Sequence, residues 1–266
     1  PDDGCMFLGV DLSQAEDRVV KCLTGDAGLI ARARMFPWEN DEHRRAAKVI
    51  FKRGNENDIT KDERYFGKKT RHANNYGEQG QRMSDDLLKE GFIIPPEECQ
   101  AMLNILNASE PEIAEWHKRV RSHILQDSKL TTSWGRELLF DGMRMDETTF
   151  GKGYAFVPQS EVGDLMNQWG FIPLHRYVMK SPMLRRTVHV NVQSHDGLLI
   201  STPPDAAWDL ACLPQESLER KRVYGDFKVP LTIWCEFSVA RTSWGKPDVE
   251  WKQFPSKEEF DAAITG

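Results

Sequence analysis

The 266-residue sequence has no run of about eighteen apolar residues, and its start has no basic segment followed by a short apolar one. The first absence excludes a membrane-spanning helix by the usual sequence criterion, and the second removes the usual sign of secretion. Cysteine is scarce as well, with no Cys-x-x-Cys pair and no Cys/His metal spacing. The five cysteines are Cys5, Cys22, Cys99, Cys212 and Cys235. We therefore expect free, buried thiols in a reducing compartment.

The chain also lacks a basic excess, since its formal net charge is −6 at pH 7. This argues weakly against nucleic acid as a partner, because phosphate-binding surfaces are normally basic. The charge is uneven, however: residues 43–72 contain ten lysines and arginines but four aspartates and glutamates. One strongly positive segment therefore lies within an acidic chain. It is either a solvated helix face or a site for anions.

The hydrophobic pattern places strands near both ends of the chain and helices in the middle, without internal repeats. Strands are predicted at 7–12 and 229–240, and hairpins at 129–140 and 187–202. Helices are predicted at about 14–23, 26–35, 40–53, 61–77, 80–90, 95–106, 110–127 and 160–179, and from 203 onward. The tail, 246–266, is polar and is predicted to be lightly structured. Because strands and helices are segregated, the fold class is α+β.

A polar stripe marks the segment RYFGKKTRHANNYG at 64–77. Arg64, Lys68, His72 and Tyr76 are four residues apart, so on a helix all four project from one face. A core stripe would be apolar at these positions. An arginine and a lysine one turn apart suit a triphosphate, and the two rings are suited to stack on a sugar and a base. The stripe therefore predicts a nucleotide site.

Two aspartates stand where apolar strands end. Asp11 closes the first strand, and Asp196 lies at the tip of the hairpin VHVNVQSHDGLLI, where Asp-Gly predicts a left-handed tight turn. Acids delivered to one place by separate strands bind a pair of divalent cations, about 3.5–4 Å apart, in phosphoryl transfer. Spacing alone does not bring these two together, and each acid by itself is more typical of a turn or a cap.

Three segments in order, DLSQAEDR (11–18), R-x3-K-x7-YG (64–77) and HD (195–196), resemble motifs A, B and C of the family A, or DNA polymerase I-like, DNA polymerases. The resemblance extends over about residues 7–245. The further matching segments are DAGLIARARMFPWENDEHRRAAKVIF (26–51), EPEIAEWHKRV (110–120), TTSWGRE (131–137), VPQSEVGDLM (157–166) and VPLTIWCEFSVARTSWG (229–245).

The resemblance implies a right-hand polymerase palm, an antiparallel sheet packed on helices, with a helical fingers subdomain. It assigns 1–25 and 129–266 to the palm and 26–128 to the fingers, with the motif B helix at about 61–77 and the motif C hairpin at about 187–202. The family's thumb and exonuclease domain lie upstream of these motifs, so we expect the C-terminal palm-and-fingers part of a phage-like or split polymerase.

The implied partners are primer-template DNA, dNTPs and the upstream thumb-containing part, without a membrane. The implied location is the cytoplasm of a bacterial cell or a phage-infected host.

The resemblance also implies roles for individual residues. Asp11 and Asp196 match the catalytic carboxylates, which with the main-chain carbonyl of Leu12 would bind two Mg²⁺ ions, with Mn²⁺ as an alternative. The positions that match dNTP-binding residues are Gln14, Glu16, His43, Arg64, Lys68, His72 and Tyr76. Those that match primer- or template-binding residues are Arg136, Gln159 and His195. Glu16 matches the residue that favours deoxynucleotides, although Ser13 and Glu16 also fit a helix capping box.

Two positions depart from the family pattern. His72 stands where Phe or Tyr is usual, and Gly197 stands where the acid of His-Asp-Glu is usual. Two aspartates, a carbonyl and phosphate oxygens still suffice for two metals, so we expect weakened rather than abolished catalysis.

Two other functions remain open from the sequence. A single-subunit phage-type RNA polymerase shares the Arg…Lys…Tyr-Gly helix and the His-Asp hairpin, but Ser13-Gln14-x-Glu16 favours DNA synthesis. A non-catalytic nucleic-acid-binding or assembly subunit with palm architecture is supported only by Gly197. The presence of Asp11 and Asp196 beside the basic stripe argues against that function.

Overall fold

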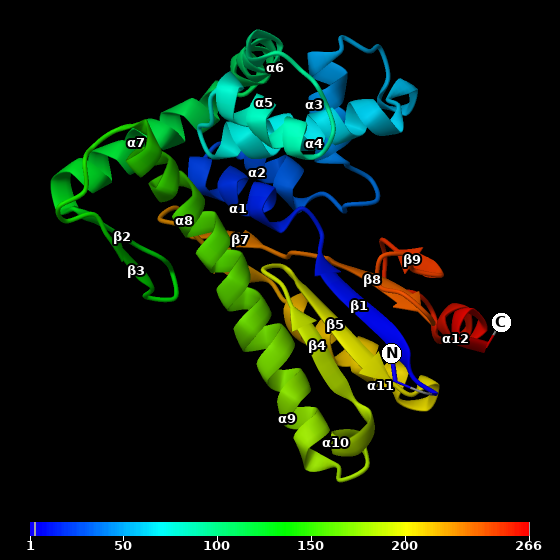
Figure 1. The fold of residues 1–266 in the computed structure, drawn as a ribbon. Helices are drawn as coiled ribbons and strands as arrows, with labels where there is room; N and C mark the ends of the chain where they lie inside the picture. The colour runs from blue at the N-terminus through cyan, green and yellow to red at the C-terminus, as the bar shows by residue number, and fades with distance from the viewer. Residues whose placement is uncertain (3, 266) are drawn as a thin grey trace.

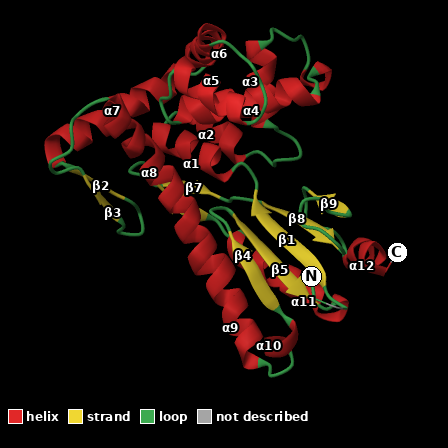
Figure 2. Cartoon of the chain, in the orientation of Figure 1, coloured by secondary structure: helices red, strands yellow, loops and turns green. Residues whose placement is uncertain are grey.

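A five-stranded antiparallel sheet forms the base of the protein in a computed structural model that describes residues 1–2 and 4–265 (Figure 1). Its strand order is β4-β5-β1-β8-β9, so the first strand of the chain lies at the centre. The strands are β1 (Met6–Leu12), β4 (His189–Gln193), β5 (Gly197–Thr202), β8 (Cys235–Ala240) and β9 (Val249–Trp251). Figure 2 shows these strands below a separate group of helices.

The alternating sequence of β1 gives this central strand one buried face and one open face. Leu8, Val10 and Leu12 are buried on one side of the sheet, and helix α11 (Pro204–Leu218) packs there. Asp11 points to the opposite side, and its strand neighbours in register are Gly197 on β5 and Glu236 on β8. The sheet therefore determines which residues surround Asp11.

The seven helices predicted between residues 14 and 127 are confirmed, with shifts of a few residues at their ends. They are α1 (Ala15–Thr24), α2 (Ala27–Arg34), α3 (Glu42–Ile50), α4 (Lys61–Asn75), α5 (Gly80–Lys89), α6 (Pro96–Ser109) and α7 (Pro111–Asp127), with a short turn η1 (Glu56–Asp58) before α4. Helix α4 starts at a capping box in which Thr60 and Glu63 bind each other's backbone N–H groups. Figure 1 shows this group, blue to green, above the end of β1 that carries Asp11.

Helices α3 and α4 touch backbone to backbone at Gly67. A Cβ atom at this position would lie 2.3 Å from the carbonyl oxygen of His43 and 2.8 Å from the amide nitrogen of Ala47. Only glycine permits this approach, which fixes His43 on α3 against the face of α4 that carries Arg64 and Lys68.

The helix predicted at 160–179 begins earlier than expected. A continuous helical rod runs through α8 (Glu147–Leu165), a π-helical turn η2 (Met166–Phe171) and α9 (Ile172–Lys180). Gly151, Gly153 and Pro158 weakened the helical pattern in the sequence. Tertiary packing overrides that preference, because Phe150 and Tyr154 are buried in the core.

Two further predictions about strands and the tail are wrong. The segment 229–240 forms two strands in different sheets: β7 (Val229–Leu231) pairs with β6 (Arg222–Tyr224), and β8 pairs with β1. The tail contains β9 and helix α12 (Lys257–Thr265), and it buries the ring of Phe260 completely. The remaining elements are the hairpin β2 (Lys129–Thr131) and β3 (Glu137–Leu139), which confirms a prediction, and α10 (Leu184–Thr187). Within residues 1–2 and 4–265, no helix is long and apolar enough to cross a membrane.

Candidate active site

A cavity of about 450 Å³ lies between the end of β1 and the N-terminal helices. One wall comes from the sheet and α1, and the other from α3 and α4. Its lining includes nine of the thirteen predicted site residues: Asp11, Leu12, Gln14, Glu16, His43, Arg64, Lys68, His72 and Asp196. The structure therefore brings together residues that are up to 185 positions apart in the sequence.

Asp11 and Asp196 meet at the floor of this cavity. The Leu12 N–H donates to the carbonyl oxygen of Asp196 at 2.8 Å, which joins the two strand ends. Desolvation at the floor of the cavity, together with the nearby carboxylates of Asp196 and Glu236, raises the pKa of Asp11 to about 7. Lys68 opposes that rise. The negative charge of these three carboxylates is therefore greater than the positive charge that nearby protein groups supply.

The turn before β5 differs from the predicted Asp-Gly turn. Neither Asp196 nor Gly197 has a positive φ, and the Ser194 N–H donates to the Gly197 carbonyl at 2.9 Å. Glycine is needed for space instead, because a Cβ atom at Gly197 would lie 3.0 Å from Asp11 Oδ1. A larger residue here would push on the carboxylate of Asp11.

A third carboxylate beside Asp11 is that of Glu236 on β8, a residue that is not among the predicted site residues. Glu236 is directly across from Asp11 in the β1–β8 register, and it also lines the cavity. The available signal was a lone acid inside the apolar run TIWCEFSVA. Ser13 donates its hydroxyl to Glu236 Oε1 at 2.6 Å, so the predicted capping box of Ser13 and Glu16 is wrong. Gln14, with φ of 52°, occupies the N-cap position of α1 instead.

Glu16 connects the three motif segments. Its carboxylate accepts hydrogen bonds from the Tyr76 hydroxyl and from His195 Nε2, the latter at 2.8 Å. The hydrogen bond with Glu16 is the main cause that raises the pKa of His195. The ring of His72 packs edge-on against Tyr76 at 4.5 Å between centroids. Tyr76 itself is buried at the C-cap of α4 and does not line the cavity, whereas Arg64, Lys68 and His72 of the same predicted stripe do.

The helical wall of the cavity carries the basic groups. Arg64 Nε donates to Asp41 Oδ2 at 2.7 Å, whereas Lys68 makes no direct ion pair among the described residues. Burial lowers the pKa of His43 to about 4, so its imidazole is neutral at pH 7. His43 Nδ1 is buried without a hydrogen-bond partner in the described part of the chain. The wall thus offers an uncommitted ammonium group and an uncommitted ring nitrogen.

Gln14 is already engaged, because its side-chain carbonyl accepts from the Glu42 N–H at 3.1 Å. None of the three predicted primer- or template-binding residues, Arg136, Gln159 and His195, lines the cavity, although His195 contacts Glu16, which does. Arg136, at the β2–β3 hairpin, pairs with Asp164 on α8, and Gln159 is half-buried on the same helix.

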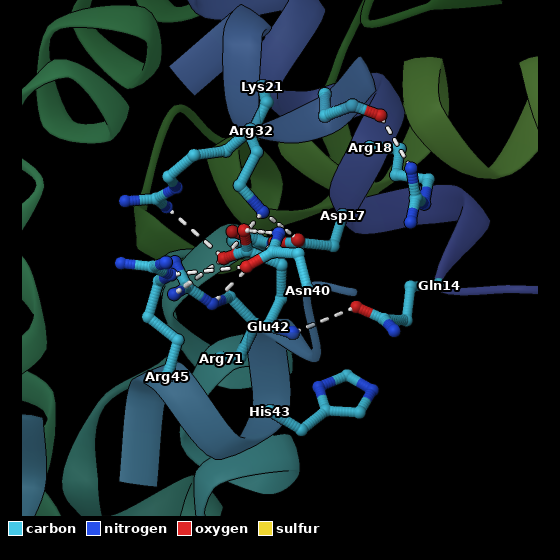
Figure 3. A network of polar contacts seen from close by, with 12 residues as sticks. Gln14, Asp17, Arg18, Lys21, Arg32, Asn40, Glu42, His43, Arg45 and Arg71 are labelled. Carbon is cyan, nitrogen blue, oxygen red and sulfur yellow. Dashed lines mark hydrogen bonds and ion pairs between the residues drawn. The ribbon is translucent and has the colours of Figure 1, made fainter. Parts of the chain in front are cut away.

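A largely buried network of charges lies beside the cavity, which two of its members, Asp17 and Arg71, also line (Figure 3). Its six members are Asp17, Lys21, Arg32, Glu42, Arg71 and Glu110. Glu42 Oε2 lies 3.1 Å from Lys21 Nζ, 3.2 Å from Arg32 and 3.5 Å from Arg71. Glu110 pairs with Arg32 and Arg71. These residues come from α1, α2, α3, α4 and the cap before α7, so the network connects the helix that follows Asp11 with the helices of the basic wall.

Similarity to known proteins identifies the fold. A family model described as DNA polymerase family A matches residues 1–246. The chain belongs to this family of polymerases. Relatives of this family A chain include the DNA polymerase of Bacillus phage SP01, 23% identical over 85% of the chain, and DNA polymerase I of Helicobacter pylori strain J99, 25% identical over 88%. The thermostable DNA polymerase I of Thermus caldophilus is 26% identical over 82%.

The fold resembles a solved structure described as the POL domain of Pol1 from M. smegmatis in complex with DNA primer-template and dNTP. The TM-score is 0.69 at 19% identity, covering 91% of this chain and 40% of that one. The family A chain spans about a quarter of the length of the curated relatives, 24% of the phage enzyme and 24% of the Helicobacter enzyme. The predicted α+β polymerase fold and family are thereby confirmed.

The oxygen atoms at the floor suit a magnesium ion. Among the described residues no three His, Cys, Asp or Glu side chains form a closed metal cage. Mg²⁺ does not require one, because it usually binds one or two carboxylates and completes its shell with water and phosphate oxygens. The partly desolvated carboxylate of Asp11, crowded by those of Asp196 and Glu236, also favours a cation beside it.

Proposed function

We propose that this chain is the catalytic part of a template-directed DNA polymerase that adds deoxynucleotides to a primer 3′-hydroxyl. The observation that carries the proposal is the single cavity in which Asp11 and Asp196 face Arg64 and Lys68. Carboxylates at one wall and cations at the other match the needs of a metal-bound triphosphate. Its DNA polymerase relatives and its membership of family A support the same conclusion.

Asp11, Asp196 and the carbonyl of Leu12 would hold two Mg²⁺ ions. When bound, such ions lower the pKa of the attacking hydroxyl and neutralise charge on the leaving pyrophosphate. Lys68 and Arg64 bind the triphosphate, Lys68 as a point charge and Arg64 as a forked donor once it exchanges Asp41 for phosphate. His43 has a neutral ring with a free nitrogen that can donate to the same group.

Glu16 forms the wall at the sugar of the incoming nucleotide. Its carboxylate is held by Tyr76 and His195, so it is fixed in place before a nucleotide arrives. A rigid carboxylate excludes a ribose 2′-hydroxyl by contact and favours deoxynucleotides. His195 then lies between the sugar site and the end of the primer.

Primer-template DNA and an upstream thumb-containing part complete the proposed enzyme. Phosphate contacts supply much of nucleic-acid affinity, and the net charge of −6 leaves this chain poorly equipped to supply them alone. We therefore expect extension by the chain combined with a thumb-containing fragment to exceed extension by the chain alone.

Primer extension by that combination, with Mg²⁺ and dNTPs, tests the proposal. Asp11→Asn and Asp196→Asn should each lower the rate about 1,000-fold, the effect of losing roughly 4 kcal/mol of transition-state stabilisation. Asp226→Asn, in the turn between β6 and β7 and outside the cavity, is the matched control and should leave the rate unchanged. Undiminished extension by Asp11→Asn would refute the metal assignment, and equal use of NTPs and dNTPs would favour an RNA polymerase.

A further inference from the structure

A second cavity, of about 280 Å³, adjoins the active-site cavity on the open face of the sheet. Three residues line both cavities: Asp11, Glu236 and Lys252. Lys252 is the only one of the three that is absent from the predicted motifs and from the residues 1–246 matched by the family model. A lysine that lies beyond the residues matched by the family model thus borders the active-site cavity.

The segment that carries Lys252 is firmly anchored. Strand β9 pairs with β8 through Phe237 opposite Trp251, which places the next residue, Lys252, near Glu236. The rings of Trp251 and Phe260 stack at 5.7 Å, and Phe260 is fully buried. Phe254 packs edge-on against Phe237 at 4.8 Å. Aromatic contacts on both sides of Lys252 therefore fix its backbone against the sheet, which a lightly structured tail would not do.

The ammonium group of Lys252 is uncommitted. Lys252 is exposed, and its side chain makes no hydrogen bond or ion pair with any described residue, although carboxylates line the same cavities. The Lys68 side chain, on the opposite wall, likewise makes no hydrogen bond or ion pair with a described residue. Two lysines without direct partners thus line one cavity whose floor is acidic. A lysine ammonium is a compact point charge that binds phosphate well.

We propose that Lys252 binds a phosphate group of the polymerase substrates, which makes the C-terminal segment after residue 246 part of the active site. This inference rests on the proposed function. The phosphate belongs either to the incoming dNTP, which would then be held between Lys68 and Lys252, or to the backbone of the primer-template. Both sources present the same anionic oxygens to the lysine.

Steady-state extension and DNA binding by the chain combined with its thumb-containing part test the proposal, with dATP and a primer-template duplex as probes. The variants are Lys252→Ala, Lys252→Arg, which keeps the charge, and Lys246→Ala. The last is the matched control, because Lys246 is an exposed lysine directly before this segment and lines neither cavity. Thermal unfolding should be the same for all, since the Lys252 side chain has no partner among the described residues.

Lys252→Ala should weaken phosphate binding about 5- to 30-fold, and Lys252→Arg should restore most of it. A rise in KM for dATP with unchanged DNA affinity identifies the triphosphate. A rise in Kd for the duplex, with the slope of log Kd against log salt reduced by about 0.9, identifies a backbone phosphate.

The proposal is overturned if Lys252→Ala matches Lys246→Ala in both KM and Kd. That result, together with loss of extension in Asp11→Asn, would leave the proposed function intact. Absence of extension by the wild type would remove both proposals.

Discussion

Replacing Glu42 by glutamine tests whether the buried charge network holds α3 and α4, the helices that carry the basic groups of the cavity, against α1. Glu42 is 1% exposed and faces three cations, Lys21, Arg32 and Arg71. The network contains three acids and three bases, so its charges balance. Glu42→Gln keeps the shape of the side chain but leaves one buried positive charge without a partner.

The expected loss of stability follows from the pKa of Glu42. Lys21 and the two arginines lower this pKa from 4.5 to about 2, despite the opposing effect of burial. A depression of that size corresponds to about 3 kcal/mol at neutral pH. Removing one partner of a buried pair costs a similar amount, about 3–5 kcal/mol. The glutamate contribution is complete above pH 4.5 and is lost as the pH falls toward 2, so wild type and Glu42→Gln should converge in stability in acid.

Urea unfolding at pH 7, followed by circular dichroism, measures this loss. Glu42→Gln should lower the free energy of unfolding by about 3–4 kcal/mol. Adding Arg32→Gln removes the excess positive charge and should recover part of the loss in a double-mutant cycle. Glu115→Gln, which breaks an exposed pair with Lys118 on α7, is the control and should change stability by less than about 0.5 kcal/mol. A loss below about 1 kcal/mol for Glu42→Gln would show that the network does not hold these helices together.

Two further predictions concern the packing that positions the site. Gly67→Ala should force α3 away from α4, because the new Cβ would lie 2.3 Å from a backbone oxygen. We expect about 1–3 kcal/mol of destabilisation and a raised KM for dNTP. An unchanged KM would contradict the role given to this contact. Phe260→Ala should lower the free energy of unfolding by about 3–5 kcal/mol and loosen the segment that carries Lys252. Amide hydrogen exchange should then be faster in β9 than in β1. Equal exchange protection of β9 in variant and wild type would show that this ring does not anchor the segment.

Much of the fold could be predicted because its signals are local. The capping box of Thr60 and Glu63, the prolines that start α6 and α7 and the four-residue spacing of the basic stripe all act within a turn or two of helix. The helical start of α8 was missed because glycine and proline weaken a helix locally, whereas the burial of Phe150 and Tyr154 that stabilises it depends on distant residues.

The sequence by itself determined the helices, the polar face of α4 and, through its resemblance to family A, the pairing of Asp11 with Asp196. Only the tertiary structure placed Glu236 and Lys252 at the cavity, because strand register across the sheet decides which side chains face Asp11. The same holds for Gly197, which is required by the space beside Asp11 rather than by its turn. The order of residues along the chain defines local neighbours. Neighbours across a sheet or within a buried charge network arise only when distant segments pack together.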